Sequence, residues 1–215
     1  MGRVSVDSFL LDYRISRLEH LFKYRKETRM RKLVVSEWMT LDGVFDAATM
    51  DKWFIPYHSK ERAAYITEVT ESCDAMLYGR TTYEFLAPHW SAEKNDDNGP
   101  AAKLNSVRKY VVSSTLKKAE WNNSTIIKDH VVEAITKLKQ QQGGEILVTG
   151  SGALVQSLME ADLIDEYRFL VHPIIMGSGK RFFNDGNTAP LKLLEAKPLS
   201  LGVVLLHYQS AKKER

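Results

Sequence analysis

The sequence has only one cysteine, Cys73, and no long apolar run. A single thiol excludes an internal disulfide framework and is typical of the reducing cytoplasm. A membrane-spanning helix needs about 20 consecutive apolar residues. The N-terminus also lacks the short apolar segment and small-residue cleavage site of a signal peptide. We therefore expect a cytoplasmic protein with no membrane partner.

Several catalytic motifs are missing as well. The six histidines are scattered, with no HExxH or CxxC partner, which excludes a catalytic zinc site. Gly150-Ser151-Gly152 lacks the GxSxG spacing of a nucleophile elbow. Gly177-Ser-Gly-Lys180 is no P-loop, because Ile174 and Arg181 stand where glycine and a hydroxyl residue are required. A metallohydrolase, a serine hydrolase and a P-loop kinase are therefore not expected.

The chain lacks a basic surplus outside its N-terminus. Residues 1–32 carry nine Lys or Arg and four Asp or Glu, which leaves 21 basic and 23 acidic residues for the remainder. A slightly acidic body argues against a nucleic-acid groove. We expect no nucleic-acid partner.

Residues 1–30 form an N-terminal extension that differs in pattern from the rest. Leu11, Ile15 and Leu18 make an apolar stripe at helical spacing, and basic residues become denser after it. Three interpretations stay open: a helix that packs on the body or a partner, a basic helix that binds a surface, or translated upstream sequence. Met30-Arg31-Lys32, directly before a strand pattern, favours the last.

Residues 31–215 have the length and apolar content of one domain with one core. Helical patterns follow Ser59, follow Gly79, and cover Val131–Gln142 and the segment up to Ala161. Strand patterns alternate with these helices, then follow one another near the C-terminus: Leu33–Met39, Ala75–Tyr78, Lys109–Ser113, Thr125–Ile127, Ile146–Val148, Ile164–Met176, Leu191–Pro198 and Gly202–Gln209. This order predicts an α/β fold with a mostly parallel sheet and an antiparallel C-terminal edge.

Three of these strands end in groups suited to an anion. Gly79 is followed by Arg80, Thr81 and Thr82, and the next strand ends in Ser113, Ser114 and Thr115. The strand at Ile146–Val148 leads through Gly150, Ser151 and Gly152 into a helix that begins with Ala153 and Leu154. Taken alone, the first and third segments are equally explained by a plain helix cap or turn, and a plain turn is the better interpretation of Ser113–Thr115. Together they indicate a dinucleotide phosphate site, because open α/β sheets bind ligands at the carboxyl ends of their strands.

Two further features are open to a structural and a functional interpretation. Asp42-Gly43 is an ordinary turn pair, although Asp42 could also take part in catalysis. Trp53 belongs to an aromatic cluster in the first half of the chain. Such aromatics form either the core or the wall of a site for a flat heteroaromatic substrate.

The order and spacing of these segments resemble the dihydrofolate reductase-like superfamily. The motifs are Thr40-Leu41-Asp42-Gly43, Gly79–Glu84, Val112-Ser113-Ser114 and Val148–Gly152. More closely, the chain resembles the stand-alone relatives of the C-terminal reductase domain of the riboflavin-biosynthesis deaminase/reductase. The segments Leu158–Glu166, Pro173–Phe182 and Leu191–Tyr208 match this group too, so that the resemblance covers about residues 31–210.

The resemblance implies a central, mostly parallel eight-stranded sheet with flanking helices, NADPH as hydride donor, and a homodimer. Arg80, Thr81 and Thr82 would hold phosphate, and Ser113 and Ser114 would lie near the adenosine 2′-phosphate. The segment Gly150–Ala153 would hold the pyrophosphate. Leu41, Asp42 and Gly43 would lie beside the nicotinamide and the substrate, with Asp42 or water as proton donor.

The substrate residues of the two established groups are absent. Ala63 stands where dihydrofolate reductases carry a carboxylate, and Ser36 and Thr149 replace a lysine and a glutamate of the riboflavin-pathway reductases. We therefore expect an NADPH-dependent reductase of a pterin, a pyrimidine similar to 5-amino-6-ribosylaminouracil, or a related small heterocycle. The alternative is a non-catalytic nucleotide-binding or scaffold protein that retains the fold.

Overall fold

A computed structural model describes residues 30–92, 100–183 and 188–211. The predicted N-terminal extension, apart from Met30, lies outside these residues. Among the helices of the described residues, none has the length and apolar character needed to cross a membrane.

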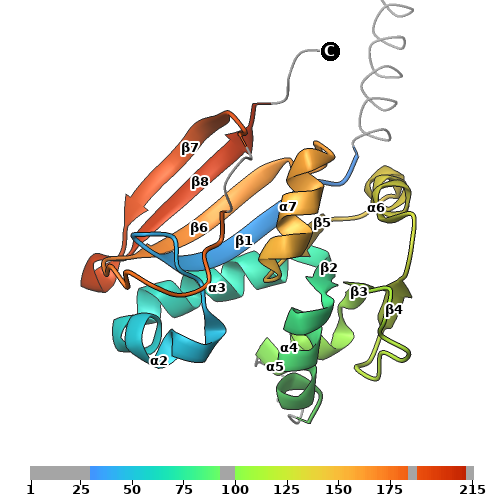
Figure 1. Cartoon of the computed structure of the whole chain (residues 1–215), viewed down its shortest axis with the longest axis horizontal. Helices are drawn as coiled ribbons and strands as arrows, with labels where there is room; N and C mark the ends of the chain where they lie inside the picture. The colour runs from blue at the N-terminus through green and yellow to red at the C-terminus, as the bar shows by residue number, and fades with distance from the viewer. Residues whose placement is uncertain (1–29, 93–99, 184–187, 212–215) are drawn as a thin grey trace, which may run out of the picture.

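The centre of the molecule is one eight-stranded sheet (Figure 1). Its strands are β1 Leu33–Thr40, β2 Cys73–Gly79, β3 Arg108–Val112, β4 Ser124–Ile127, β5 Glu145–Val148, β6 Glu166–His172, β7 Leu191–Pro198 and β8 Val204–Ser210. Their spatial order is β4-β3-β2-β5-β1-β6-β8-β7, with parallel pairing from β4 to β6 and antiparallel pairing of β6, β8 and β7. The predicted fold class, a mostly parallel sheet with an antiparallel C-terminal edge, is confirmed.

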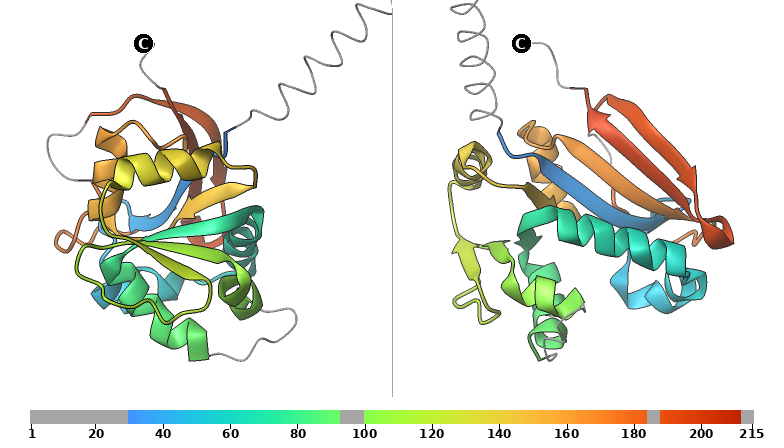
Figure 2. Two further views of the ribbon diagram at one scale, coloured as in Figure 1. Left: turned by 90° about the vertical axis from the view of Figure 1, so that its right-hand side faces the viewer. Right: turned by 180° about the vertical axis from the view of Figure 1, so that it is seen from behind.

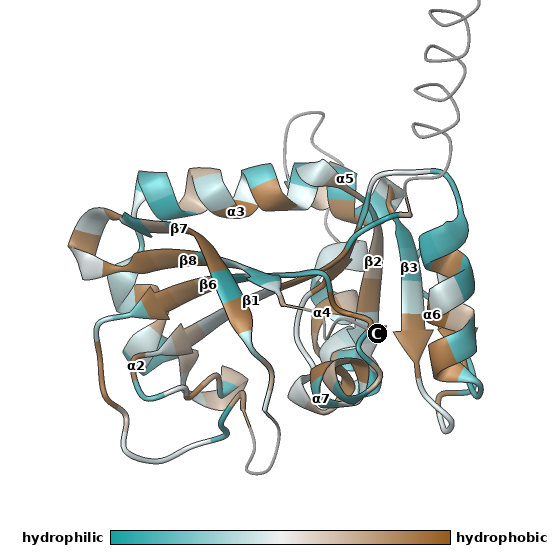
Figure 3. Cartoon of the chain, turned by 90° about the horizontal axis from the view of Figure 1, so that it is seen from above, coloured by the Kyte–Doolittle hydropathy of each residue, from teal (hydrophilic) through white to brown (hydrophobic). Residues whose placement is uncertain are grey.

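Helices cover both faces of the sheet (Figure 3). On one face lie α3 Lys60–Ser72, α4 Arg80–Ala92 and α5 Pro100–Ser106, and the other face is covered by α6 Val131–Gln140 and α7 Gly152–Glu160. In the rear view of Figure 2, α3 lies in front of the strands. Ser59 caps α3 as predicted, because its Oγ accepts the backbone N–H of Arg62 at 3.1 Å.

The sequence patterns missed the compact segment between β1 and α3. It contains two 3₁₀ turns, Ala47–Thr49 and Ile55–Tyr57, around the short helix α2 Met50–Trp53. None of these is long enough to produce an apolar period of its own. The strand predicted for Ile164–Met176 is also shorter than expected, since β6 ends at His172, just before Pro173. Proline has no N–H to continue the ladder.

Strand β1 distributes its side chains to the two faces in turn. Val35 and Met39 pack in the cluster with α6 and α7, whereas Val34 packs in the cluster with α3 and α4. Because side chains alternate along a strand, Glu37 belongs to the first face and Ser36 to the second. This alternation decides which β1 side chains lie beside the two parts of the candidate site.

Strand β1 also extends beyond its neighbour β5. The last pair of their register is Val35 with Val148, whereas β1 continues to pair with β6 as far as Thr40. From Ser36 onward the sheet is therefore open between β1 and the chain that leaves β5. The turn at Gly150 lies at this opening.

Candidate functional site

The helix start after β2 and the turn after β5 are in direct contact. A Cβ added to Gly79 would lie 2.0 Å from Ser151 Oγ, and a Cβ added to Gly150 would lie 2.5 Å from Thr82 Cγ2. Gly150 also has a φ of +74°, a conformation that side chains disfavour. Glycine is thus required at both positions, and two of the predicted phosphate-binding segments form one surface.

Helix α7 begins without a side-chain cap. Its N-cap Ser151 has a left-handed backbone with φ of +71°, and the Ser151 side chain accepts none of the first N–H groups of the helix. Uncapped N–H groups and the positive end of the helix dipole favour an anion at this position. Gly152 and Ala153 supply this first turn, whereas the Leu154 side chain is buried in the core with Val155.

Arg80 connects the first turn of α4 with the end of β3. Its Nη1 donates a 2.7 Å hydrogen bond to Thr115 Oγ1, and its Nε pairs with Glu84 at 2.9 Å. Ser113 Oγ closes the turn after β3 by accepting the N–H groups of Thr115 and Leu116 at 3.2 and 2.9 Å. Arg80 remains exposed, so its guanidinium is accessible to a ligand as well.

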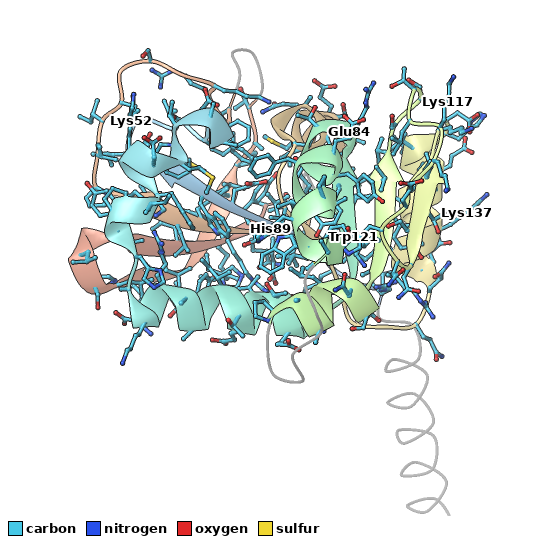
Figure 4. The ribbon with its side chains drawn as sticks, turned by 90° about the horizontal axis from the view of Figure 1, so that it is seen from below. Lys52, Glu84, His89, Lys117, Trp121 and Lys137 are labelled. Carbon is cyan, nitrogen blue, oxygen red and sulfur yellow. The ribbon has the colours of Figure 1, made fainter. Side chains whose placement is uncertain are left out.

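The base of this surface is packed. Trp121 is buried, its backbone N–H donates to Tyr83 Oη at 2.9 Å, and its ring stacks on Tyr78 with centroids 6.2 Å apart. Figure 4 shows Trp121 between α4 and the strands at this edge, with Glu84 on the same helix. This packing fixes α4 against β2 and β3, and so holds Arg80 beside Thr115.

Glu37 is a buried carboxyl group at the sheet opening. Glu37 is only 5% exposed, and its Oε1 accepts a hydrogen bond from the backbone N–H of Gly150. Burial raises its pKa to about 8, although the Gly150 hydrogen bond acts in the opposite direction. Glu37 therefore holds a proton at neutral pH, directly beside the turn predicted to bind phosphate. Sequence analysis missed it, and the only signal was an acid within an otherwise apolar strand.

Asp42 has a different environment. Its Oδ1 accepts hydrogen bonds from Thr40 Oγ1 at 2.6 Å and from Met176 N at 3.2 Å, and its Oδ2 accepts from Gly177 N at 2.9 Å. The Thr40 bond, followed by the two backbone bonds, lowers its pKa to about 2. Asp42 is thus ionised at neutral pH and has no proton to donate. It anchors the segment after β6 to the Leu41–Gly43 turn.

A largely apolar cavity of about 340 Å³ lies on the α3 face of the sheet. This volume is within the range of small-molecule sites. The lining residues come from β1, β2, β5, the three helices of this face and the segment before α3: Ser36, Trp38, Phe54, His58, Arg62, Ala63, Ile66, Thr67, Val69, Thr70, Met76, Tyr78, Leu86, Trp90, Pro100, Leu104, Leu147 and Thr149. Thr149 directly precedes Gly150, so the cavity adjoins the predicted phosphate-binding turn.

The predicted substrate residues lie outside this lining. Trp53 is 2% exposed, donates from Nε1 to Asp46 O at 3.1 Å, and packs edge-on against Phe54 and His172 behind the cavity. The Leu41–Gly43 turn is on the loop that contacts α7, where a Cβ on Gly152 would meet the Phe45 ring at 2.8 Å. The cavity wall instead contains three other aromatic residues from the first half of the chain, Trp38, Phe54 and Trp90.

Comparisons with known proteins agree with this architecture. The chain is 28% identical over 186 residues to the uncharacterized protein YyaP of Bacillus subtilis, covering 84% of this chain and 95% of YyaP. A pyrimidine reductase-like protein from Corynebacterium diphtheriae superposes with a TM-score of 0.63 at 10% identity, covering 85% and 93% of the two chains. Dihydrofolate reductase from Enterococcus faecalis, complexed with NADP(H), superposes with a TM-score of 0.57 at 14% identity, covering 84% of this chain and 97% of the reductase. The sequence model of the RibD C-terminal domain matches residues 31–205, and the chain therefore belongs to the RibD C-terminal domain family.

Proposed function

We propose that this protein is an NADPH-dependent reductase that acts on a small planar heterocycle, of the pterin or pyrimidine type, bound in the cavity beside Thr149. The observation that carries the proposal is the convergence of three strand ends. The α4 start, the end of β3 and the β5–α7 turn lie side by side, joined by the Gly79–Ser151 contact and the Arg80–Thr115 hydrogen bond. NADPH, when bound, would supply the hydride.

The donor set fits a phosphorylated dinucleotide. The start of α7 after Gly150 offers uncapped N–H groups to a pyrophosphate, since its N-cap Ser151 makes no side-chain cap and glycine lets the backbone approach. Arg80 and Thr115 form a cationic and hydroxyl edge for a further phosphate. These residues bind and orient, and the family relationship supports the choice of cofactor.

The sheet opening between β1 and the end of β5 would admit the reactive end of the cofactor. At this opening, Glu37 lies on one face of the sheet, and the cavity lined by Ser36 and Thr149 lies on the other face. Glu37 would keep its proton at this position because its pKa is raised to about 8. Its role would be to donate a hydrogen bond or proton where the ionised Asp42 cannot.

Turnover is tested by following NADPH absorbance with purified protein and a panel of oxidised pterins, pyrimidines and quinones. A substrate-dependent decay that saturates with NADPH supports the reductase. Saturable NADPH binding without decay on any member of the panel would favour the non-catalytic alternative. No saturable NADPH binding would contradict both the cofactor assignment and the reductase proposal.

A further inference from the structure

Arg62 places a buried positive charge on the wall of the cavity. It belongs to α3, is 2% exposed, and lines the cavity between Phe54 and Ala63. Its guanidinium carbon lies 4.0 Å from the centroid of the Phe54 ring, which itself stacks on Trp38 with centroids 4.5 Å apart. A cation over an aromatic face is held in orientation by the ring. The guanidinium is thus fixed in place at the cavity wall.

One nitrogen of the guanidinium carries all its hydrogen bonds to described residues. Nη1 donates to Phe54 O at 2.6 Å and lies 3.1 Å from His172 Nε2. Arginine can only donate, so Nε2 of His172 accepts and its Nδ1 carries the ring proton. That Nδ1 lies 3.1 Å from Met39 O, to which it donates. His172 is therefore neutral, in line with the lowering of its pKa by burial.

The opposite edge of the guanidinium has no such partners. Nε is buried and makes no hydrogen bond to any described residue, and none from Nη2 is found among the same residues. Nor does Arg62 form an ion pair within the described part of the chain, and its pKa is lowered by burial alone. A buried charged donor without a partner is costly to the fold. Nε is closed off from solvent whereas Nη2 is not, so Nη2 is the nitrogen that can donate to a carboxylate in the cavity.

Among the described residues, no side chain at the cavity supplies the missing negative charge. The described lining includes no Asp or Glu, and its only ionisable side chains besides Arg62 are His58 and Tyr78. Trp38, Phe54 and Trp90 give the remaining wall flat apolar surfaces. This combination favours a flat ring with an anionic substituent over a neutral or cationic ring.

We propose that the cavity binds a planar heterocycle that carries a carboxylate, and that this carboxylate accepts a charged hydrogen bond from Nη2 of Arg62, which makes no hydrogen bond to a described residue. The inference rests on the proposed reductase function, since it names the substrate class for the same cavity. Arg62 would bind the substrate, and the neutral His172 would be a positioning residue that holds the guanidinium toward it. A substrate with a carboxylate would supply the negatively charged partner that the described residues do not provide.

The test compares two probes of the same shape, quinoline-2-carboxylate and quinoline-2-carboxamide, titrated into the protein without NADPH and followed by tryptophan fluorescence. Wild type should bind the carboxylate about tenfold or more tightly than the amide, as expected for a charge-assisted pair. Arg62→Leu should reduce this ratio to about twofold or less. Arg108→Leu, which removes an exposed arginine at the amino end of β3, should keep the wild-type ratio.

Equal affinity of wild type for the two probes would overturn the inference, as would an unchanged ratio in a folded Arg62→Leu. If circular dichroism shows that Arg62→Leu is unfolded, the wild-type ratio and Arg62→Lys decide. The lysine variant keeps the charge without the planar edge, so it should retain only part of the preference. NADPH affinity is measured separately on each variant. If wild type does not bind NADPH, the proposed function is contradicted, but the preference for the carboxylate probe still supports this inference. If NADPH binds and wild type shows no preference for the carboxylate probe, only this inference is contradicted.

Discussion

The Cα of Gly79 lies so close to Ser151 that an added Cβ would be 2.0 Å from Ser151 Oγ and 2.5 Å from its Cβ. This contact joins the start of α4 to the turn before α7, two segments more than 70 positions apart in the sequence. Ser151 in turn has a left-handed backbone, which residues other than glycine rarely adopt. The shape of the candidate phosphate-binding surface therefore depends on the absence of a side chain at Gly79.

Gly79→Ala should therefore separate the two segments. The expected loss in the free energy of unfolding is about 1–3 kcal/mol, from overpacking at a buried contact. The expected weakening of NADPH binding is about tenfold or more, because the two parts of the surface no longer meet. Urea denaturation and fluorescence titration measure the two effects.

Gly144→Ala is the matched control for this prediction. Its added Cβ would meet Ser72 O at 3.4 Å, an ordinary contact distance, and Gly144 does not need a positive φ. NADPH affinity should stay at the wild-type value. Wild-type stability and affinity in Gly79→Ala would show that the contact is unimportant.

Glu37→Gln should change the pH dependence of stability. The pKa of Glu37 is raised from 4.5 to about 8 in the folded protein, so the folded state keeps a proton that the unfolded state releases. Its contribution to stability is thus complete below about pH 4.5 and is lost as the pH rises toward 8. The slope for one proton is at most about 1.4 kcal/mol per pH unit. Glutamine can still accept the Gly150 N–H but has no proton to release, so the variant should lack this decline.

Urea denaturation from pH 5 to pH 9 checks the prediction on wild type and variant. The exposed Glu68 provides the control, since Glu68→Gln should leave the wild-type profile in place. Parallel profiles for wild type and Glu37→Gln would mean that Glu37 titrates at its ordinary pH in the folded protein.

Asp42→Asn should destabilise the loop after β6 at neutral pH. The ionised carboxylate accepts bonds from Thr40, Met176 and Gly177, and its pKa is lowered to about 2. This stabilisation is present above about pH 4 and is lost as the pH falls toward 2. The expected cost of the substitution at pH 7 is about 1–2 kcal/mol, from weakened hydrogen bonds to a charged acceptor.

The difference between wild type and Asp42→Asn should become smaller below pH 4, and thermal unfolding across this range measures it. Asp51→Asn, at an exposed position of α2, should have no such effect. A difference that stays constant down to pH 2 would show that the charge of Asp42 does not matter.

Most of the fold could be predicted from local pattern. The strand Leu191–Pro198 has the predicted bounds, and the Ser59 cap places the start of α3 correctly. Alternating strands and helices indicated the parallel sheet, because both kinds of element show their period within a few residues. The phosphate-binding segments were recognisable for a similar reason, since glycine after a buried strand is a local signal.

The roles of the buried ionisable side chains could not be predicted in the same way. Arg62 follows a helix cap at a position where a charged residue is usually solvated, yet it is buried against Phe54 and His172. Glu37 is buried beside the Gly150 turn, where β1 extends past the end of β5. Both depend on contacts between segments far apart in the chain, which no local period records. The acidic Asp42 was singled out, but its bonds to residues 176 and 177 were equally beyond the reach of pattern.

Titration of the tryptophan fluorescence with NADPH and with NADH, in wild type and in Arg80→Ala, tests the cofactor site most directly. Trp38 and Trp90 line the cavity and Trp121 packs beneath α4, so a dinucleotide bound across these segments should change their emission. We predict saturable binding with a preference for NADPH, and a loss of that preference in Arg80→Ala but not in Arg108→Ala. No saturable change up to millimolar NADPH, or an Arg80→Ala protein with the wild-type preference, would contradict the account.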